Sequence, residues 1–233
     1  MARKKGNIKR QKMQWILLWI VVITIGLGWK YPLLGYSVPV VMITGMVVSI
    51  FRGRYVCGNL CPRGSFLDRI ISQFSPMKEI PGFFRGMVFR WVVFSLLMGF
   101  MLYRGLQSPT DIANWGHVFW TMCVVTTLLA IFLATFINAR SWCAFCPIGT
   151  VQNVFGGSKE LLQINGDACK DCKLCEKSCT FDLPITQYKD QGVVLERDCI
   201  KCSECVASCP TKALSWPQKT IPAMEGKTAT SHA

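Results

Sequence analysis

The sequence predicts a helical membrane domain of four transmembrane helices, built as a repeated pair, followed by a small α+β domain. Three observations predict this fold class. Of the 233 residues, 51% are hydrophobic and only 17% are charged, a balance too apolar for an ordinary soluble domain. Four long apolar runs occupy the first part of the chain. Eight of the 13 cysteines are concentrated in one stretch of the last part.

The apolar runs set the expected element boundaries. We expect helices over about residues 13–29, 33–51, 87–106 and 117–137, each near the length that a bilayer span requires. A short amphipathic helix is expected over residues 65–74. The predicted organisation is a basic N-terminus (1–12), a membrane domain (13–157), a cysteine-rich domain (158–216) and a disordered polar tail (217–233).

Basic residues are distributed unequally between the segments that join these helices. The net charge of +13 is explained by membrane orientation, and we expect no nucleic-acid partner. Both termini and the cysteine-rich domain are therefore predicted to lie in the cytoplasm, with the chain a multi-pass protein of a prokaryotic cytoplasmic (inner) membrane. Arg90 is close enough to its helix end to snorkel. The predicted outside loops hold Lys30 and Arg104, and the predicted inside segments before the tail hold Arg3, Lys4, Lys5, Lys9, Arg10, Lys12, Arg52, Arg54, Arg63, Arg69, Lys78, Arg85, Arg90 and Arg140.

The cysteine-rich stretch contains the spacing C-x2-C-x2-C-x3-C twice, and the second copy ends in Cys-Pro. This is the pattern of bacterial two-cluster ferredoxins, in which the fourth cysteine of each run binds the other cluster. It predicts a small ferredoxin-like domain with two [4Fe-4S] clusters. The predicted ligands are Cys169, Cys172, Cys175 and Cys209 for cluster I, and Cys199, Cys202, Cys205 and Cys179 for cluster II.

Two other uses of these cysteines fit less well. A zinc ribbon usually offers two C-x2-C pairs to one metal, without a third closely spaced thiol. A disulfide framework does not suit a domain expected in the reducing cytoplasm. The iron–sulfur interpretation is therefore favoured.

A second cysteine pattern follows each pair of predicted helices. Arg54 precedes Cys57, Cys61 and Pro62, and Arg140 precedes Cys143, Cys146 and Pro147; each copy continues as x-Gly-Ser/Thr. An even number of spans per repeat would place both loops on one membrane face, related by an axis along the membrane normal. Four thiols could then hold one further iron–sulfur centre, or the loops could hold a flavin or a redox disulfide. Alternatively, Cys-Pro merely shapes a helix end.

The four helices, the two Cys-Pro loops and the two-cluster tail together resemble the NapH/NosR/MauN group of polytopic membrane ferredoxins. The resemblance covers nearly the whole chain, without the long extracytoplasmic flavin-binding region of NosR-like members. It implies electron transfer between membrane quinol and partner redox proteins.

The predicted function is accordingly that of an iron–sulfur electron-transfer protein between the quinone/quinol pool, or another membrane donor, and a redox partner. The chain would be the electron-transfer subunit of an oxidoreductase complex, with a role of the quinol dehydrogenase type. Its partner would be ferredoxin-like or a reductase subunit. The alternatives are a maturation factor that binds or reduces a metal for a metalloenzyme, and a membrane anchor with structural or sensory clusters. No catalytic triad or phosphate-binding loop is visible in the sequence.

Other isolated residues carry weaker signals. His117 is a poor haem site because axial ligation usually needs a second ligand. It could hydrogen-bond a quinol near the outer face, with Asp111 accepting a proton, but an ordinary interfacial histidine is the favoured interpretation. Cys123 is expected to pack as a small hydrophobic residue. Lysines near the clusters could guide an acidic partner: Lys170, Lys173, Lys177 and Lys201.

Overall fold

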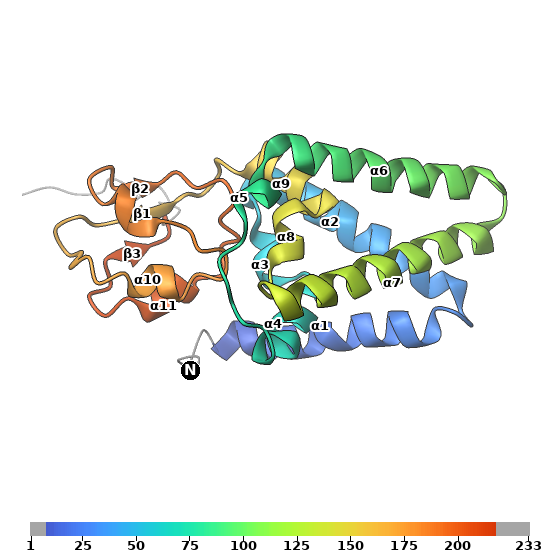
Figure 1. Cartoon of the computed structure of the whole chain (residues 1–233), viewed down its shortest axis with the longest axis horizontal. Helices are drawn as coiled ribbons and strands as arrows, with labels where there is room; N and C mark the ends of the chain where they lie inside the picture. The colour runs from blue at the N-terminus through green and yellow to red at the C-terminus, as the bar shows by residue number, and fades with distance from the viewer. Residues whose placement is uncertain (1–7, 218–233) are drawn as a thin grey trace, which may run out of the picture.

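Long helices and a compact cysteine-rich domain lie at opposite ends of the molecule (Figure 1). The computed structural model describes residues 8–217. The first part of the predicted basic N-terminus, residues 1–7, and almost all of the predicted polar tail lie outside this range. The long helices are α1 (Ile8–Leu27), α2 (Ser37–Arg52), α6 (Met87–Leu106) and α7 (Ile112–Phe136).

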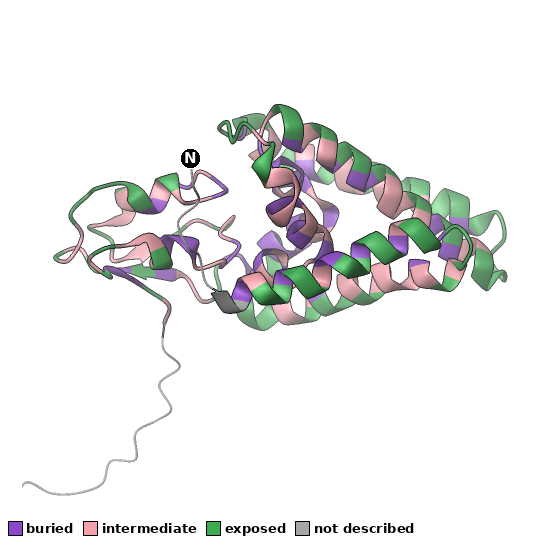
Figure 2. Ribbon diagram, turned by 90° about the horizontal axis from the view of Figure 1, so that it is seen from below, coloured by how far each residue is buried: buried purple, intermediate pink, exposed green. Residues whose placement is uncertain are grey.

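Three segments of the described chain are long and apolar enough to cross a membrane. They are Pro32–Arg52, which joins the 3-10 helix η1 (Pro32–Tyr36) to α2, then Met87–Leu106 and Ile112–Phe136. Large apolar side chains on these helices are exposed, among them Ile43, Leu96 and Leu128. Figure 2 shows exposed positions along the outer faces of the long helices. Such faces are suited to lipid. The chain is therefore a membrane protein.

Helix α1 is not among these three segments. It begins at Ile8, so Lys9, Arg10 and Lys12 fall within its first turns. Its apolar part runs only from Met13 to Leu27, which is shorter than the roughly 20 residues that usually cross a bilayer. The prediction of four spans therefore stays a prediction.

The remaining long helices lie close to their predicted positions. The third has the predicted bounds, Met87–Leu106. The fourth begins earlier than predicted, at Ile112, because the Asp111 carboxylate accepts a hydrogen bond from the Ala113 backbone N–H (2.9 Å). A capped start of this kind satisfies a donor that the helix itself leaves free.

Short helices gather at one end of the long ones. They are α3 (Tyr55–Asn59), α4 (Pro62–Arg69), η2 (Ile71–Gln73), α5 (Gly82–Arg85), α8 (Ser141–Phe145) and α9 (Pro147–Gly156). The amphipathic helix expected over residues 65–74 is thus divided between α4 and η2. Pro62 and Pro147 begin α4 and α9, where a missing backbone donor costs little.

The C-terminal domain is a small α+β unit. Its antiparallel sheet has the order β2-β1-β3, with Gln163 opposite both Val193 and Ser215. Buried Leu162 and Ile164 on β1 point to one side of this sheet and form its core with neighbouring apolar residues. The elements are β1 (Leu162–Ile164), α10 (Leu174–Lys177), η3 (Ile185–Tyr188), β2 (Val193–Val194), α11 (Glu204–Ser208) and β3 (Leu214–Ser215).

Candidate functional site: two cysteine quartets and a membrane cavity

Each predicted quartet of tail cysteines lines its own small cavity. Cys169, Cys172, Cys175 and Cys209 line one, and Cys179, Cys199, Cys202 and Cys205 line the other. Each set thus combines one C-x2-C-x2-C run with the displaced cysteine of the opposite run, the donor set that a cubane cluster needs. The described residues contain no group of three or more His, Cys, Asp or Glu side chains placed to hold a single metal ion. The cysteines of a cubane bind different irons, so they need not converge on one point.

Both cysteine runs turn through the left-handed backbone region at matching positions. Asp171 and Lys173 have φ of 52° and 54°, and Lys201 and Ser203 have φ of 54° and 62°. Lys173 and Ser203 directly precede α10 and α11. The repeated turns bend each run around its own cavity.

Burial raises the pKa of several of these thiols in the absence of a cation. It raises the pKa of Cys179 to about 12 and those of Cys175 and Cys199 to about 11. A thiol that binds iron must give up its proton, so metal binding at these sites is coupled to proton release.

The four cysteines of the Cys-Pro loops meet at a different place, one end of a cavity of about 150 Å³ within the membrane domain. Most of the cavity wall is apolar and comes from α1, α2, α6 and α7, including Val41, Leu97 and Phe119. The Cys57 thiol donates to Gln152 Oε1 (3.0 Å). Burial raises the pKa of Cys57 to about 12, although the positive charge of Arg54 opposes this shift. The cysteine end contains Cys57, Cys61, Cys143 and Cys146.

The arginine of each Cys-Pro motif binds the other motif. Arg54 Nη2 donates to the Cys143 carbonyl (2.8 Å), and Arg140 Nη1 donates to the Cys57 carbonyl (3.0 Å). Such reciprocal contacts are expected if the two loops are related by pseudo-twofold symmetry, and they support the predicted repeat.

The residues after each proline also have matching roles. A Cβ on Gly64 would lie 2.7 Å from Arg140 Nη1, and one on Gly149 would lie 2.8 Å from Arg54 Nη2. Ser65 and Thr150 each donate to the carbonyl of the second cysteine, four residues earlier (3.0 and 3.1 Å). The Pro-x-Gly-Ser/Thr pattern therefore leaves room for the opposite arginine and satisfies a carbonyl near a helix start.

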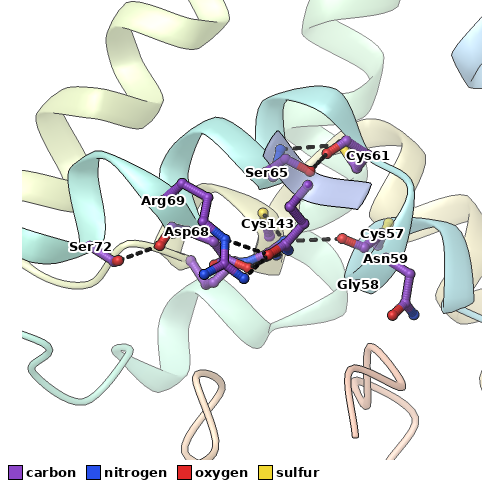
Figure 3. Close-up of polar contacts among 12 residues, drawn as sticks. Cys57, Gly58, Asn59, Cys61, Ser65, Asp68, Arg69, Ser72 and Cys143 are labelled. Atoms are coloured by element: carbon purple, nitrogen blue, oxygen red, sulfur yellow. Dashed lines mark hydrogen bonds and ion pairs between the residues drawn. The ribbon is translucent and has the colours of Figure 1, made fainter. Parts of the chain in front are cut away.

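Asp68 joins α4 to α1 and to the second Cys-Pro loop through buried ion pairs. Arg140 Nε and Nη2 donate to its two carboxylate oxygens (2.9 and 2.7 Å), and Arg10 Nη2 donates to Oδ2 (2.8 Å). Figure 3 shows Asp68 close to Cys57 and Cys143. Burial alone would lower the pKa of Arg140, but the charge of Asp68 raises it well above its usual range. Arg10, predicted to be part of a basic flank, is thus a buried structural residue; it also pairs with Glu204 (2.5 Å).

Asp198 joins the C-terminal domain to the membrane domain. Arg90 donates to both of its carboxylate oxygens (2.9 and 2.6 Å), and Arg54 and Asn153 donate to Oδ1 (2.7 and 2.6 Å). Burial alone would raise the pKa of Asp198, but the Arg90 hydrogen bonds and the charges of both arginines lower it. The prediction that Arg90 snorkels is wrong, because its side chain is 2% exposed and paired.

The two cysteine regions also touch directly. A Cβ on Gly58, between Cys57 and Cys61, would lie 2.0 Å from the carbonyl oxygen of Ile200, the residue after Cys199. Asn59 donates to the Lys201 carbonyl (3.1 Å). Lys201 itself is buried and donates to the Lys159 carbonyl, so the prediction that it guides a partner from the surface is wrong. Its companions Lys170, Lys173 and Lys177 are exposed.

Several cavity residues were not identified from the sequence. Arg63 was counted only as an orientation signal, and Trp142 and Gln152 carried no signal. Cys123, expected only to pack, lines the same cavity as the Cys-Pro cysteines. The sequence held one clue to the role of Arg63. It is a cation directly after the first Cys-Pro, whereas the second copy has Ile148 at the matching position.

The option of a quinol site at His117 and Asp111 receives no support from these contacts. Asp111 caps α7, and His117 is exposed near the start of that helix. Neither residue lines the cavity.

Comparison with known proteins agrees with both cysteine regions. The 4Fe-4S binding domain family matches residues 34–77 and 120–165, and the 4Fe-4S dicluster domain family matches residues 168–214. No solved structure matches the chain.

Three relatives share most of the chain at low identity. Two uncharacterised proteins of Methanocaldococcus jannaschii are 27% and 26% identical, each over 75% of this chain and over 68% and 76% of their own lengths. The ferredoxin-type protein NapH of Haemophilus influenzae is 27% identical over 72% of this chain and 63% of its own length. The chain is therefore an iron–sulfur electron-transfer protein with 4Fe-4S domains, a NapH-like membrane ferredoxin.

Proposed function

We propose that this chain relays electrons between the quinone/quinol pool and a redox partner protein, as the electron-transfer subunit of an oxidoreductase complex. One observation carries the proposal: the Cys-Pro cysteines line a membrane cavity, and their loop contacts the Cys199 loop through Gly58 and Ile200. A lipophilic donor bound in this cavity would therefore lie next to the cysteines of the C-terminal domain. The partner would be ferredoxin-like or a reductase subunit.

Two [4Fe-4S] clusters are the proposed carriers in the C-terminal domain. The cluster I ligands would be Cys169, Cys172, Cys175 and Cys209, and the cluster II ligands Cys179, Cys199, Cys202 and Cys205. When bound, each cluster takes up and releases one electron. The chain supplies the thiolates, the burial and the nearby charges, all of which tune the potential.

The four Cys-Pro cysteines are proposed to hold a further redox centre, for which an iron–sulfur cluster is the first candidate. Arg140 Nη1 lies 3.6 Å from the Cys143 sulfur, and the Gly64 N–H lies 3.4 Å from the Cys61 sulfur. Donors placed in this way would stabilise thiolates.

The first test is iron and acid-labile sulfide per chain, with electron paramagnetic resonance of the reduced protein, after anaerobic purification in mild detergent. Two cubanes require about 8 Fe. A clearly larger value that falls in Cys57→Ser and Cys143→Ser would support a further centre. A value near 8 that these variants leave unchanged would rule it out.

The second test mixes the oxidised protein with a quinol and follows bleaching of the visible cluster absorbance. A quinol gives up two electrons and releases two protons to water, and two clusters accept one electron each. Fast bleaching supports the quinol assignment. Clusters that dithionite reduces but no quinol does would contradict it.

Metalloenzyme maturation is the second candidate. Thioether and thiol ligands favour Cu(I), and Met42, Met98, Met101 and Met122 line the same cavity as five cysteines. This function predicts substoichiometric copper or iron that is lost in Cys57→Ser. If quinol reduces the protein and its cavity cysteines hold no metal, the maturation function is contradicted.

A further inference from the structure

Arg63 is a cation in the membrane cavity without a carboxylate partner among residues 8–217. It lines the cavity beside Cys61 and Cys146 and is only partly exposed. Its Nη1 donates to the Thr126 hydroxyl (2.5 Å), and its guanidinium lies 5.5 Å from the centre of the Trp142 ring. The neighbouring buried arginines at positions 10, 54, 90 and 140 all have carboxylate partners. A charge removed from water without an ionic partner calls for a ligand that accepts hydrogen bonds.

The other Cys-Pro loop shows that the fold does not need this charge. Arg63 lies between Pro62 and Gly64, and the matching position between Pro147 and Gly149 is Ile148. Both residues line the cavity. The same local structure therefore forms around an apolar side chain, and the arginine makes one wall of the cavity polar.

Two more hydrogen-bond donors at this end have no partner within the described chain. They are the indole N–H of Trp142 and the Nε2 of Gln152, which belong to residues 2% and 0% exposed. Both residues line the cavity, and Gln152 Nε2 also lies against Gly45. Buried donors are rarely left unpaired in proteins. Three donor-bearing side chains therefore lie at the cysteine end of a cavity that is otherwise apolar.

A ligand for this cavity needs an apolar body and an end rich in acceptor oxygens. The apolar walls belong to the long helices, and Trp142 at the cysteine end offers a ring that can stack on a planar group. A quinone has this chemistry, with carbonyl oxygens on a planar ring and an isoprenoid tail. The thiol groups beside Arg63 would place a redox centre next to that ring.

We propose that this cavity is the quinone site of the protein, with Arg63 donating to a carbonyl oxygen of the head group at the cysteine end. This inference rests on the proposed quinone relay and locates it. It assigns the head group to the end that contacts the C-terminal domain, away from His117 and Asp111.

The test uses the full-length protein with its clusters, as wild type, Arg63→Met, Arg63→Lys and a matched control. Arg104→Gln is the control, because Arg104 is exposed near the opposite end of the helices and forms no ion pair among the described residues. Binding of a short-tailed quinone is measured by equilibrium dialysis, and a photoreactive quinone is cross-linked and mapped by mass spectrometry. Iron content and reduction by dithionite report folding and cluster loading.

We expect Arg63→Met to weaken quinone binding about tenfold or more, the loss expected for a charge-assisted hydrogen bond, with unchanged iron. Arg63→Lys should retain part of the affinity, Arg104→Gln should bind normally, and the cross-link should map to the cysteine end of the cavity, near Thr126 or Trp142. Unchanged binding in Arg63→Met, or cross-links near His117, would overturn the site while leaving a quinol-reducible relay intact. A wild-type protein that binds no quinone and is not reduced by quinol would overturn both proposals. Binding of only Cu(I) or an anionic lipid at Arg63 would also overturn the quinone site.

Discussion

At the scale of single residues, charged side chains have two different roles near the Cys-Pro loops. Asp68 and Asp198 each pair with two arginines from distant parts of the chain, whereas Arg63 lines the cavity without a carboxylate partner among the described residues. Paired buried charges satisfy one another and fix the loops. The unpaired charge is free to interact with a ligand. The arginines near the Cys-Pro loops therefore differ in role, because the residues packed around them differ.

Asp68→Asn should strongly destabilise the membrane domain. The Asp68 side chain is 2% exposed and pairs with Arg10 and Arg140, so its neutralisation leaves two buried cations without this counter-charge. Removal of one partner of a buried ion pair typically costs about 3–5 kcal/mol. Thermal unfolding in detergent, followed by circular dichroism, measures the change.

The matched control is Arg52→Gln, which breaks the exposed pair between Arg52 and Glu160. That pair should contribute about 1 kcal/mol or less. Equal stability losses in the two variants would contradict a special role for the Asp68 network.

At the scale of elements, close contacts between small residues set how the helices meet. Gly35 in η1 lies against Gly116 in α7: a Cβ on Gly35 would come within 2.1 Å of the Gly116 carbonyl oxygen, and one on Gly116 within 2.3 Å of the Pro32 carbonyl oxygen. Small residues allow backbones to approach in this way in membrane proteins. The contact holds the far end of the helices together.

Gly116→Ala should separate η1 from α7 and lower stability by about 1–3 kcal/mol, as overpacking does. Gly99→Ala is the control, because Gly99 lies within α6 and its Cβ would have no neighbour within 4 Å. Alanine there should be neutral or slightly stabilising. Detergent melting temperatures compare the two variants, and a Gly116→Ala protein as stable as Gly99→Ala would show that the close approach is unimportant.

At the scale of the whole molecule, both cysteine regions lie at the same end of the long helices. Both Cys-Pro loops, the start of α1 and the C-terminal domain are found there, and the turns at η1 and between α6 and α7 lie at the other (Figure 1). This arrangement is expected if α1 crosses the membrane together with the three apolar segments, since the two Cys-Pro loops and the C-terminal domain then share one side. The positive-inside rule acts on the sequence during insertion, so the later burial of Arg54 or Arg140 does not weaken it.

The proposed topology has four spans with both termini in the cytoplasm. Alkaline phosphatase fused after residue 108 should therefore be active, and fusions after residue 60 or residue 217 should be inactive. A fusion after residue 30 tests α1 itself and should be active. If α1 does not cross, the residue 30 fusion would be inactive, and the other results would show which way the remaining spans run.

The sequence by itself determined the chemistry of the tail and the order of the elements. Cysteine spacing alone grouped Cys179 with the Cys199 run and Cys209 with the Cys169 run, and the structure places each group around one cavity. Apolar run length located three helices because a bilayer imposes a minimum span. These signals depend on local spacing or on the length of an apolar run, so they can be recognised in the sequence alone.

Only the tertiary structure decided which charges are buried and where the membrane cavity lies. Arg10 and Glu204 are 194 residues apart, and no local pattern predicts their contact. The same holds for the reciprocal bonds of Arg54 and Arg140, and for the gathering of Arg63, Trp142 and Gln152. Burial and pairing depend on which distant segments pack together, and packing of this kind has no period or spacing in the sequence.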